Sequence, residues 1–147
     1  WQYSGTGDSS EPSQGRYDFG FFFGSYDSRG SLCWAYNWGR RFDTTTGENW
    51  LYAWTTPYGA VRAPFWEGVR EAWDDRRHIE TLRVEAKKAG KEAEAEELLG
   101  EIFKTAVSQR AAGGRDTVNN FWARTKDPDA LDGMRGRIAA KIMEWQK

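Results

Sequence analysis

The residues of this sequence best suited to binding chemistry are aromatic side chains between positions 31 and 54. The chain holds 9 Trp, 6 Tyr and 8 Phe among 147 residues. Aromatic rings offer flat apolar faces on which a sugar ring can stack, and an amide such as Asn37 could hydrogen-bond to sugar hydroxyl groups. The same rings could instead form a hydrophobic core, which is the interpretation preferred for Trp34. The candidate sugar-binding residues are Tyr36, Asn37, Trp38, Trp50 and Trp54.

Asp74 and Asp75 are the carboxylate pair that would most suggest acid–base catalysis. The surrounding pattern is helical, and adjacent residues of a helix point about 100° apart, so the two groups should not converge on one substrate. We expect one of them to bond Arg70 or a neighbouring loop. His78 is expected at the surface or in packing, and Cys33 is expected to be an inert core thiol. The sequence thus predicts no catalytic residue in this chain.

Composition excludes several classes of function. One cysteine and one histidine rule out a disulfide framework, a multi-cysteine metal site and a histidine-rich metal centre, and no cofactor is expected. The 21 basic and 22 acidic residues give a net charge of −1, which offers no electrostatic basis for binding nucleic acid. No apolar run approaches the roughly 20 residues that span a membrane. We therefore expect neither nucleic acid nor a membrane as a partner.

Local signals predict helices in the second half of the sequence. Pro64 suits the first position of a helix, and Gly90 suits the position just after its end. A second helix is expected from about 91 to 112. A last helix should begin at Pro128, after Asp127 as its N-cap. The apolar stripe expected on the first of these helices comprises Phe65, Val69, Ala72, Ile79 and Ala86, with Trp66 and Trp73 beside it.

The first half of the sequence is predicted to be mixed. Residues 31–38 form a continuous apolar run, typical of a parallel strand covered on both faces. Residues 16–28 are expected to be helical, with glycines where another backbone packs closely. Residues 4–15 should be a loop. Residues 50–54 fit either a short strand or an aromatic loop, before a turn at 57–59.

This order of elements predicts the fold class. One buried strand between helices is what the closing piece of a (β/α)8-type barrel would show, because a whole barrel needs about 250 residues. We therefore expect an α/β unit over residues 1–90, followed by an all-α helical tail over residues 91–147 that packs on it. The chain should be mostly helical overall. It also begins at Trp1 rather than Met, which favours a piece of a longer protein.

Three blocks of the sequence carry a resemblance to a known family. They are GSLCWAYNW at 30–38, YAWTTPYG at 52–59 and WEGVREAWDDRRHIETL at 66–82. In this order they resemble the C-terminal end of bacterial glycoside-hydrolase-like barrels related to glycoside hydrolase family 123. The similarity covers about residues 16–90. Ala72 stands where the family usually has glycine, and His78 where it has an aromatic residue.

The resemblance implies a carbohydrate-active protein that acts as a glycoside hydrolase when complete. Its partners would be a glycan or polysaccharide and the N-terminal part of its own barrel, in an extracellular or periplasmic location. The catalytic Asp-Glu pair of that family lies on a strand with no counterpart here, so this chain would supply only an aromatic wall of the glycan cleft. Two alternatives remain open. The chain could be a non-catalytic structural or interaction module whose aromatic residues only form a core, or a self-standing aromatic-rich binding domain.

Overall fold

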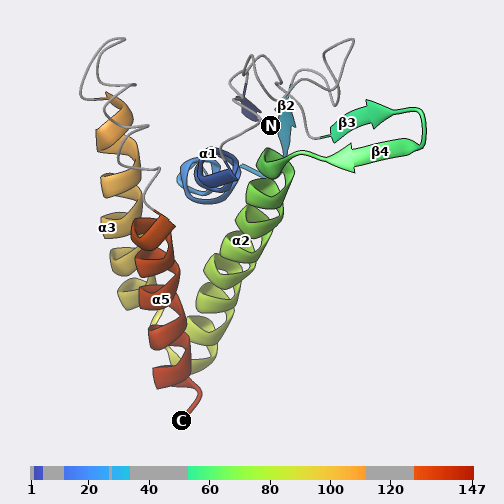
Figure 1. Cartoon of the computed structure of the whole chain (residues 1–147). Coiled ribbons are helices and arrows are strands. Elements are labelled where there is room, and N and C mark those ends of the chain that lie inside the picture. Colours follow the sequence, from blue (N-terminus) through green and yellow to red (C-terminus); the bar gives the residue numbers. More distant parts are fainter. Residues whose placement is uncertain (1, 5–11, 27, 34–52, 112–127) are drawn as a thin grey trace.

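The computed structural model describes residues 2–4, 12–26, 28–33, 53–111 and 128–147. Helices account for most of these residues, and the strands are short (Figure 1). In chain order the elements are β1 (Gln2–Ser4), α1 (Pro12–Arg16), the π-helical turn η1 (Tyr17–Phe22), β2 (Ser31–Cys33), β3 (Ala53–Thr56), β4 (Gly59–Arg62), α2 (Pro64–Ala89), α3 (Glu92–Ala111) and α5 (Pro128–Trp145).

Helix α2 is the longest element, and local chemistry sets both of its ends. Pro64 occupies its first turn, where the missing backbone N–H is not needed, and Ala63 before it is extended. Gly90 ends the helix in the left-handed conformation, with φ of 67°. The predicted ends are confirmed. So is the predicted apolar stripe, whose five residues are all buried.

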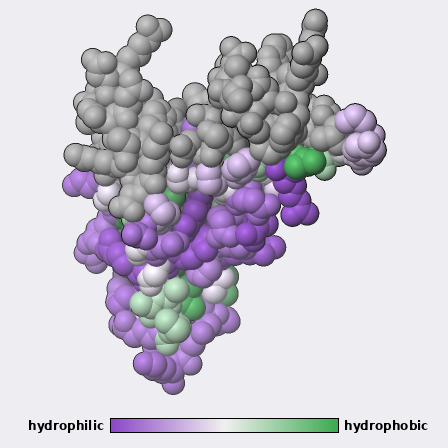
Figure 2. Space-filling view, viewed as in Figure 1, coloured by the Kyte–Doolittle hydropathy of each residue, from purple (hydrophilic) through white to green (hydrophobic). Residues whose placement is uncertain are grey.

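One hydrophobic core joins the helices on both sides of Gly90. Helices α3 and α5 pack against α2, and α1 with η1 lies across the open end of this arrangement (Figure 1). The core draws Phe21 from η1, Leu82 from α2, Leu99 from α3 and Ile138 from α5, all of them fully buried. The outer surface of the described helices is mainly hydrophilic (Figure 2), as expected for helices that bury a single apolar face.

The predicted barrel fold is wrong for the part of the chain that the structure describes. Strand β2 covers three residues of the predicted strand 31–38, and its neighbour is β1, which runs parallel to it with Gln2 opposite Ser31. Strands β3 and β4 form a separate antiparallel hairpin. A strand within a barrel needs a neighbour on each side and a covered outer face. These strands form two-stranded sheets, and every residue of β4 is exposed.

The N-terminal segment also differs from the prediction. Residues 4–15 were expected to be a loop, yet α1 begins at Pro12 and continues into η1. The helix predicted for residues 16–28 is confirmed through Gly24. The close approach expected at its glycines occurs at Gly20, where an added β-carbon would lie 3.3 Å from the α-carbon of Ala72 on α2.

Candidate functional site

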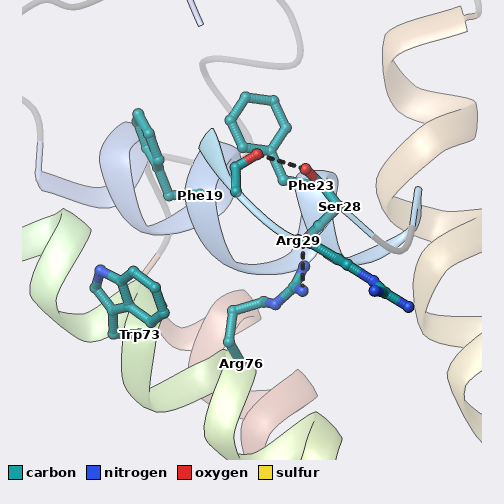
Figure 3. Close-up of a pocket in the computed structure, with 7 residues that line it drawn as sticks. Phe19, Phe23, Ser28, Arg29, Trp73 and Arg76 are labelled. Atoms are coloured by element: carbon teal, nitrogen blue, oxygen red, sulfur yellow. Dashed lines mark hydrogen bonds between the residues drawn. The ribbon is translucent and has the colours of Figure 1, made fainter. Parts of the chain in front are cut away.

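An aromatic pocket lies between η1, the turn that follows it, and helix α2. Its volume is about 300 Å³. Figure 3 shows the rings of Phe19 and Trp73 toward one side and the guanidinium of Arg76 reaching toward the turn at Ser28. The described residues that line the pocket are Phe19, Phe23, Ser28, Arg29, Gly30, Trp73 and Arg76.

Helical spacing places the pocket residues on two facing surfaces. Trp73 and Arg76 are three positions apart on α2, so their side chains share one face of that helix. Phe19 and Phe23 are four positions apart, and their rings meet edge to face with centroids 5.3 Å apart. Phe23 is buried, whereas Trp73 exposes 64% of its surface. The pocket therefore has an apolar floor and an open indole at its edge.

Two hydrogen bonds hold the turn over the pocket. Arg76 Nη2 donates to the backbone oxygen of Ser28 at 2.8 Å. The Ser28 hydroxyl donates to the backbone oxygen of Gly30 at 2.6 Å. Both bonds are visible in Figure 3. The turn is thus tied to α2, and the polar groups beside the aromatic rings are held in place.

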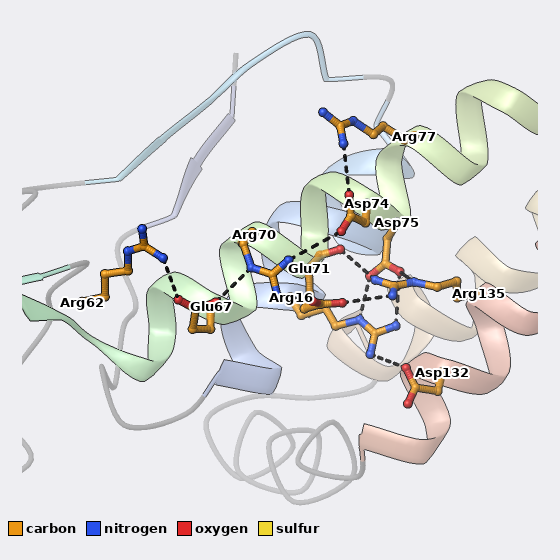
Figure 4. A network of polar contacts seen from close by, with 10 residues as sticks. All are labelled: Arg16, Arg62, Glu67, Arg70, Glu71, Asp74, Asp75, Arg77, Asp132 and Arg135. Atoms are coloured by element: carbon orange, nitrogen blue, oxygen red, sulfur yellow. Dashed lines mark hydrogen bonds and ion pairs between the residues drawn. The ribbon is translucent and has the colours of Figure 1, made fainter.

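A second cluster of chemically capable residues surrounds Asp75, which is fully buried. Its carboxylate accepts two bonds from Arg16, from Nε at 2.8 Å and from Nη2 at 3.2 Å. It also accepts a bond from Arg135 Nε at 2.5 Å. Figure 4 shows the two guanidinium groups meeting at this carboxylate from different elements. Arg16 ends α1 and Arg135 lies on α5, so Asp75 joins three helices.

Further acidic groups balance the two arginines. Arg16 Nη1 donates to Asp132 at 2.6 Å, and Arg135 donates to the carboxylate of Glu71 at 3.0 Å and to its backbone oxygen at 2.9 Å. Burial of the Arg16 guanidinium disfavours its charged form, but the hydrogen bonds to Asp75 and Asp132 outweigh this effect and raise its pKa. Arg16 therefore stays charged. This network is suited to holding helices together, because its buried carboxylate has both arginines as partners on neighbouring helices.

Among the described ion pairs, Asp74 joins neither Arg16 nor Arg135. Its carboxylate pairs with Arg77 at 3.3 Å and lies 3.9 Å from Arg70. The expectation that Asp74 and Asp75 do not converge is confirmed, as is the expected contact with Arg70. His78 is half-buried, and its Nδ1 lies 2.8 Å from the backbone oxygen of Asp74.

Among the five binding residues proposed from the sequence, the structure describes one. Tyr36, Asn37, Trp38 and Trp50 lie outside the described residues. Trp54 lies in β3, opposite Val61 of β4. The pocket instead uses Trp73, which the sequence placed only beside the apolar stripe of α2. The signal in the sequence was a tryptophan beside the predicted apolar stripe, followed three positions later by an arginine.

The described residues show neither a metal site nor a membrane segment. No three of their His, Cys, Asp or Glu side chains gather closely enough to hold a metal ion. No described helix has the length and apolar character that crossing a membrane requires. No protein-family model, no curated protein and no solved structure matches the chain.

Proposed function

We propose that this chain is a non-catalytic, carbohydrate-binding part of a carbohydrate-active protein, and that the aromatic pocket beside Trp73 binds a sugar ring. The observation that carries the proposal is the indole of Trp73, which is 64% exposed at the edge of an apolar pocket. An exposed tryptophan presents a large apolar face that a sugar ring can cover, and its indole N–H can bond a hydroxyl group.

The pocket also supplies the polar groups that a sugar needs. The turn 28–30 brings backbone carbonyl groups and the Ser28 hydroxyl close to the rings, and Arg76 adds N–H donors. A few fixed polar groups in a mainly apolar cavity are typical of small-molecule sites, and about 300 Å³ lies at the small end of their range. That size suits one sugar ring rather than a long glycan.

The resemblance of residues 66–82 to glycoside-hydrolase-like proteins favours the same class of ligand. This block falls on α2, the helix that contributes Trp73 and Arg76 to the pocket. A non-catalytic role is supported by the two aspartates of the block. Asp75 is enclosed by Arg16 and Arg135, and Asp74 is turned toward Arg77. Hydrolysis would then belong to the complete protein rather than to this chain.

A second candidate function is a purely structural module, and the buried network around Asp75 favours it. That carboxylate joins α1, α2 and α5, which is an arrangement suited to bracing. Under this alternative the exposed indole of Trp73 would have no ligand. The two candidates therefore differ in whether the pocket binds sugar.

The deciding experiment is a sugar titration of the purified chain followed by two-dimensional ¹H–¹⁵N NMR. Methyl glycosides of glucose, galactose and their N-acetylamino forms, at millimolar concentrations, should shift the indole N–H signal of Trp73 in a saturable way. Trp73→Ala should abolish binding while leaving the fold intact, because the side chain is mostly exposed. Tyr58→Ala is the matched control, since Tyr58 is 99% exposed on the β3–β4 hairpin. Indole signals that stay unmoved by every sugar would contradict the proposal and leave the structural module.

A further inference from the structure

The arginines of helix α2 divide into two groups by their partners. Those away from the pocket are paired with carboxylates: Arg70 with Glu67 at 2.9 Å, Arg77 with Asp74 at 3.3 Å and Arg83 with Glu96 at 2.8 Å. Arg76, which lines the pocket, instead bonds a backbone oxygen, that of Ser28. Within the described part of the chain, no carboxylate pairs with Arg76.

Arg29 repeats this pattern on the other side of the turn. It lines the pocket, its side chain is exposed, and no ion pair joins it to another described residue. The described lining of the pocket thus contains two guanidinium groups and no acidic side chain. The net charge of the chain is −1. Among the described residues, these two positive charges have no acidic partner at the pocket, and a bound anion would balance this local excess.

We propose that the pocket selects an acidic sugar, one that carries a carboxylate such as a uronic acid. This inference rests on the proposed function, because the aromatic rings must hold the sugar while the arginines recognise its charge. A guanidinium group has five N–H donors in a planar fork that fits a carboxylate. Arg76 uses Nη2 for Ser28 and retains further donors for a ligand.

The two arginines have different parts in this recognition. In Figure 3 the guanidinium of Arg76 lies beneath the turn, on the side of the pocket where Trp73 lies, and Arg29 extends away from the rings. Arg76 is the group that would contact the carboxylate. Arg29 raises the positive potential at the entrance, because it lines the pocket and its side chain is exposed. The buried ring of Phe23 lowers the local dielectric constant and strengthens the charge interaction.

The test compares two ligands that differ only at C6, methyl β-glucuronide and methyl β-glucoside. Calorimetric or NMR titration of the whole chain at low ionic strength should give a dissociation constant about tenfold lower for the glucuronide, as expected of one charge-assisted hydrogen bond. The difference should narrow as salt is added, because the entrance is open to solvent. Arg76→Gln should remove the preference, and Arg29→Gln should reduce it. Arg77→Gln is the matched control, since Arg77 is the next residue of α2 but pairs with Asp74.

Arg76 also holds the turn, so its substitution needs a check on the fold. Arg76→Lys keeps the charge and can still bond Ser28, but it lacks the planar fork and should lose part of the preference. If Arg76→Gln fails to fold, Arg29→Gln and the salt dependence decide the question. Equal affinity for the two ligands would overturn the selection of an acidic sugar while the proposed function stands. Failure of both ligands to bind would overturn both proposals. If the preference for the glucuronide survives Arg29→Gln and every folded variant of Arg76, the assignment of the acidic-sugar site to this pocket is overturned.

Discussion

The α-carbon of Gly68 faces the backbone carbonyl of Pro12 so closely that an added β-carbon would overlap the carbonyl oxygen. Helix α1 therefore crosses α2 with backbone against backbone at this position. The same crossing brings Gly15 near Phe65, where an added β-carbon would lie 2.9 Å from a backbone oxygen. Neither neighbour is a flexible side-chain end that could move aside, so the crossing depends on the absence of side chains at both glycines.

Gly68→Ala should destabilise the protein, because the added methyl group must displace α1. Overpacking of this kind costs roughly 1–3 kcal/mol. The measurement is the free energy of unfolding from urea denaturation, together with the NMR signals of residues 12–16, which should move. Gly100→Ala is the control, since an added β-carbon at Gly100 meets nothing within 4 Å. There the better helix propensity of alanine should stabilise by about 0.5–1 kcal/mol. A stabilising effect of both substitutions would contradict the close crossing.

Asp75→Ala should be strongly destabilising. It would leave the guanidinium groups of Arg16 and Arg135 in the interior without the carboxylate that both contact. Breaking a buried charge network by removing one member typically costs about 3–5 kcal/mol. The measurement is again the free energy of unfolding in urea, with circular dichroism to establish that the variant folds.

The neighbouring residue supplies the control for Asp75. Asp74 is also an aspartate and lies on the same helix, α2, but its ion pairs with Arg70 and Arg77 are exposed. Exposed pairs contribute roughly 0–1 kcal/mol, so Asp74→Ala should change stability little. Equal losses at the two positions would show that Asp75 gains nothing from its burial.

The ion pair between Glu94 on α3 and Lys141 on α5 predicts a dependence of stability on pH. The hydrogen bond from Lys141 lowers the pKa of Glu94, and the bonds to Glu94 and Glu144 raise the pKa of Lys141. The contribution from Glu94 is thus present above the ordinary pKa of a glutamate and disappears as the pH falls through the lowered value. The contribution from Lys141 is present below the ordinary pKa of a lysine and disappears as the pH rises through the raised value.

Urea denaturation of the wild type and of Glu94→Gln over a range of pH tests this relationship. The midpoints should differ most near neutral pH and converge in acid and in alkali. The effect should be modest and sensitive to salt, because both side chains are partly exposed to solvent. Glu97→Gln on the same helix is the control. If the two variants follow the same pH profile, the pair between α3 and α5 contributes nothing to stability.

Features of the fold that depend on residues close together in the sequence could be predicted from it. The ends of α2 depend on Pro64 and Gly90, whose backbone preferences act within one turn. The buried stripe of α2 follows from the helical period alone. The outward direction of Asp74 relative to Asp75 follows from the same geometry.

Features that depend on distant segments could not be predicted in this way. Arg16 and Asp75 are 59 positions apart, and no spacing rule connects them. The pocket could not be predicted, because it forms only where the turn after η1 meets α2. The barrel prediction was wrong because an apolar run such as 31–38 indicates a strand without indicating its neighbours. In the described residues the neighbour of β2 is the three-residue strand β1.

The position of Asp75 along the chain has a consequence for the order of folding. Arg16 precedes Asp75 by 59 positions and Arg135 follows it by 60, so the chain must close two long loops before this carboxylate has its partners. Closing such loops is entropically costly, whereas α2 and α3 are neighbours joined at Gly90. We therefore expect α2 and α3 to pair early, while Asp75 is still hydrated, and the helices carrying the two arginines to dock last. Loss of Asp75 should then act mainly by accelerating unfolding, because its contacts form after the rate-limiting barrier.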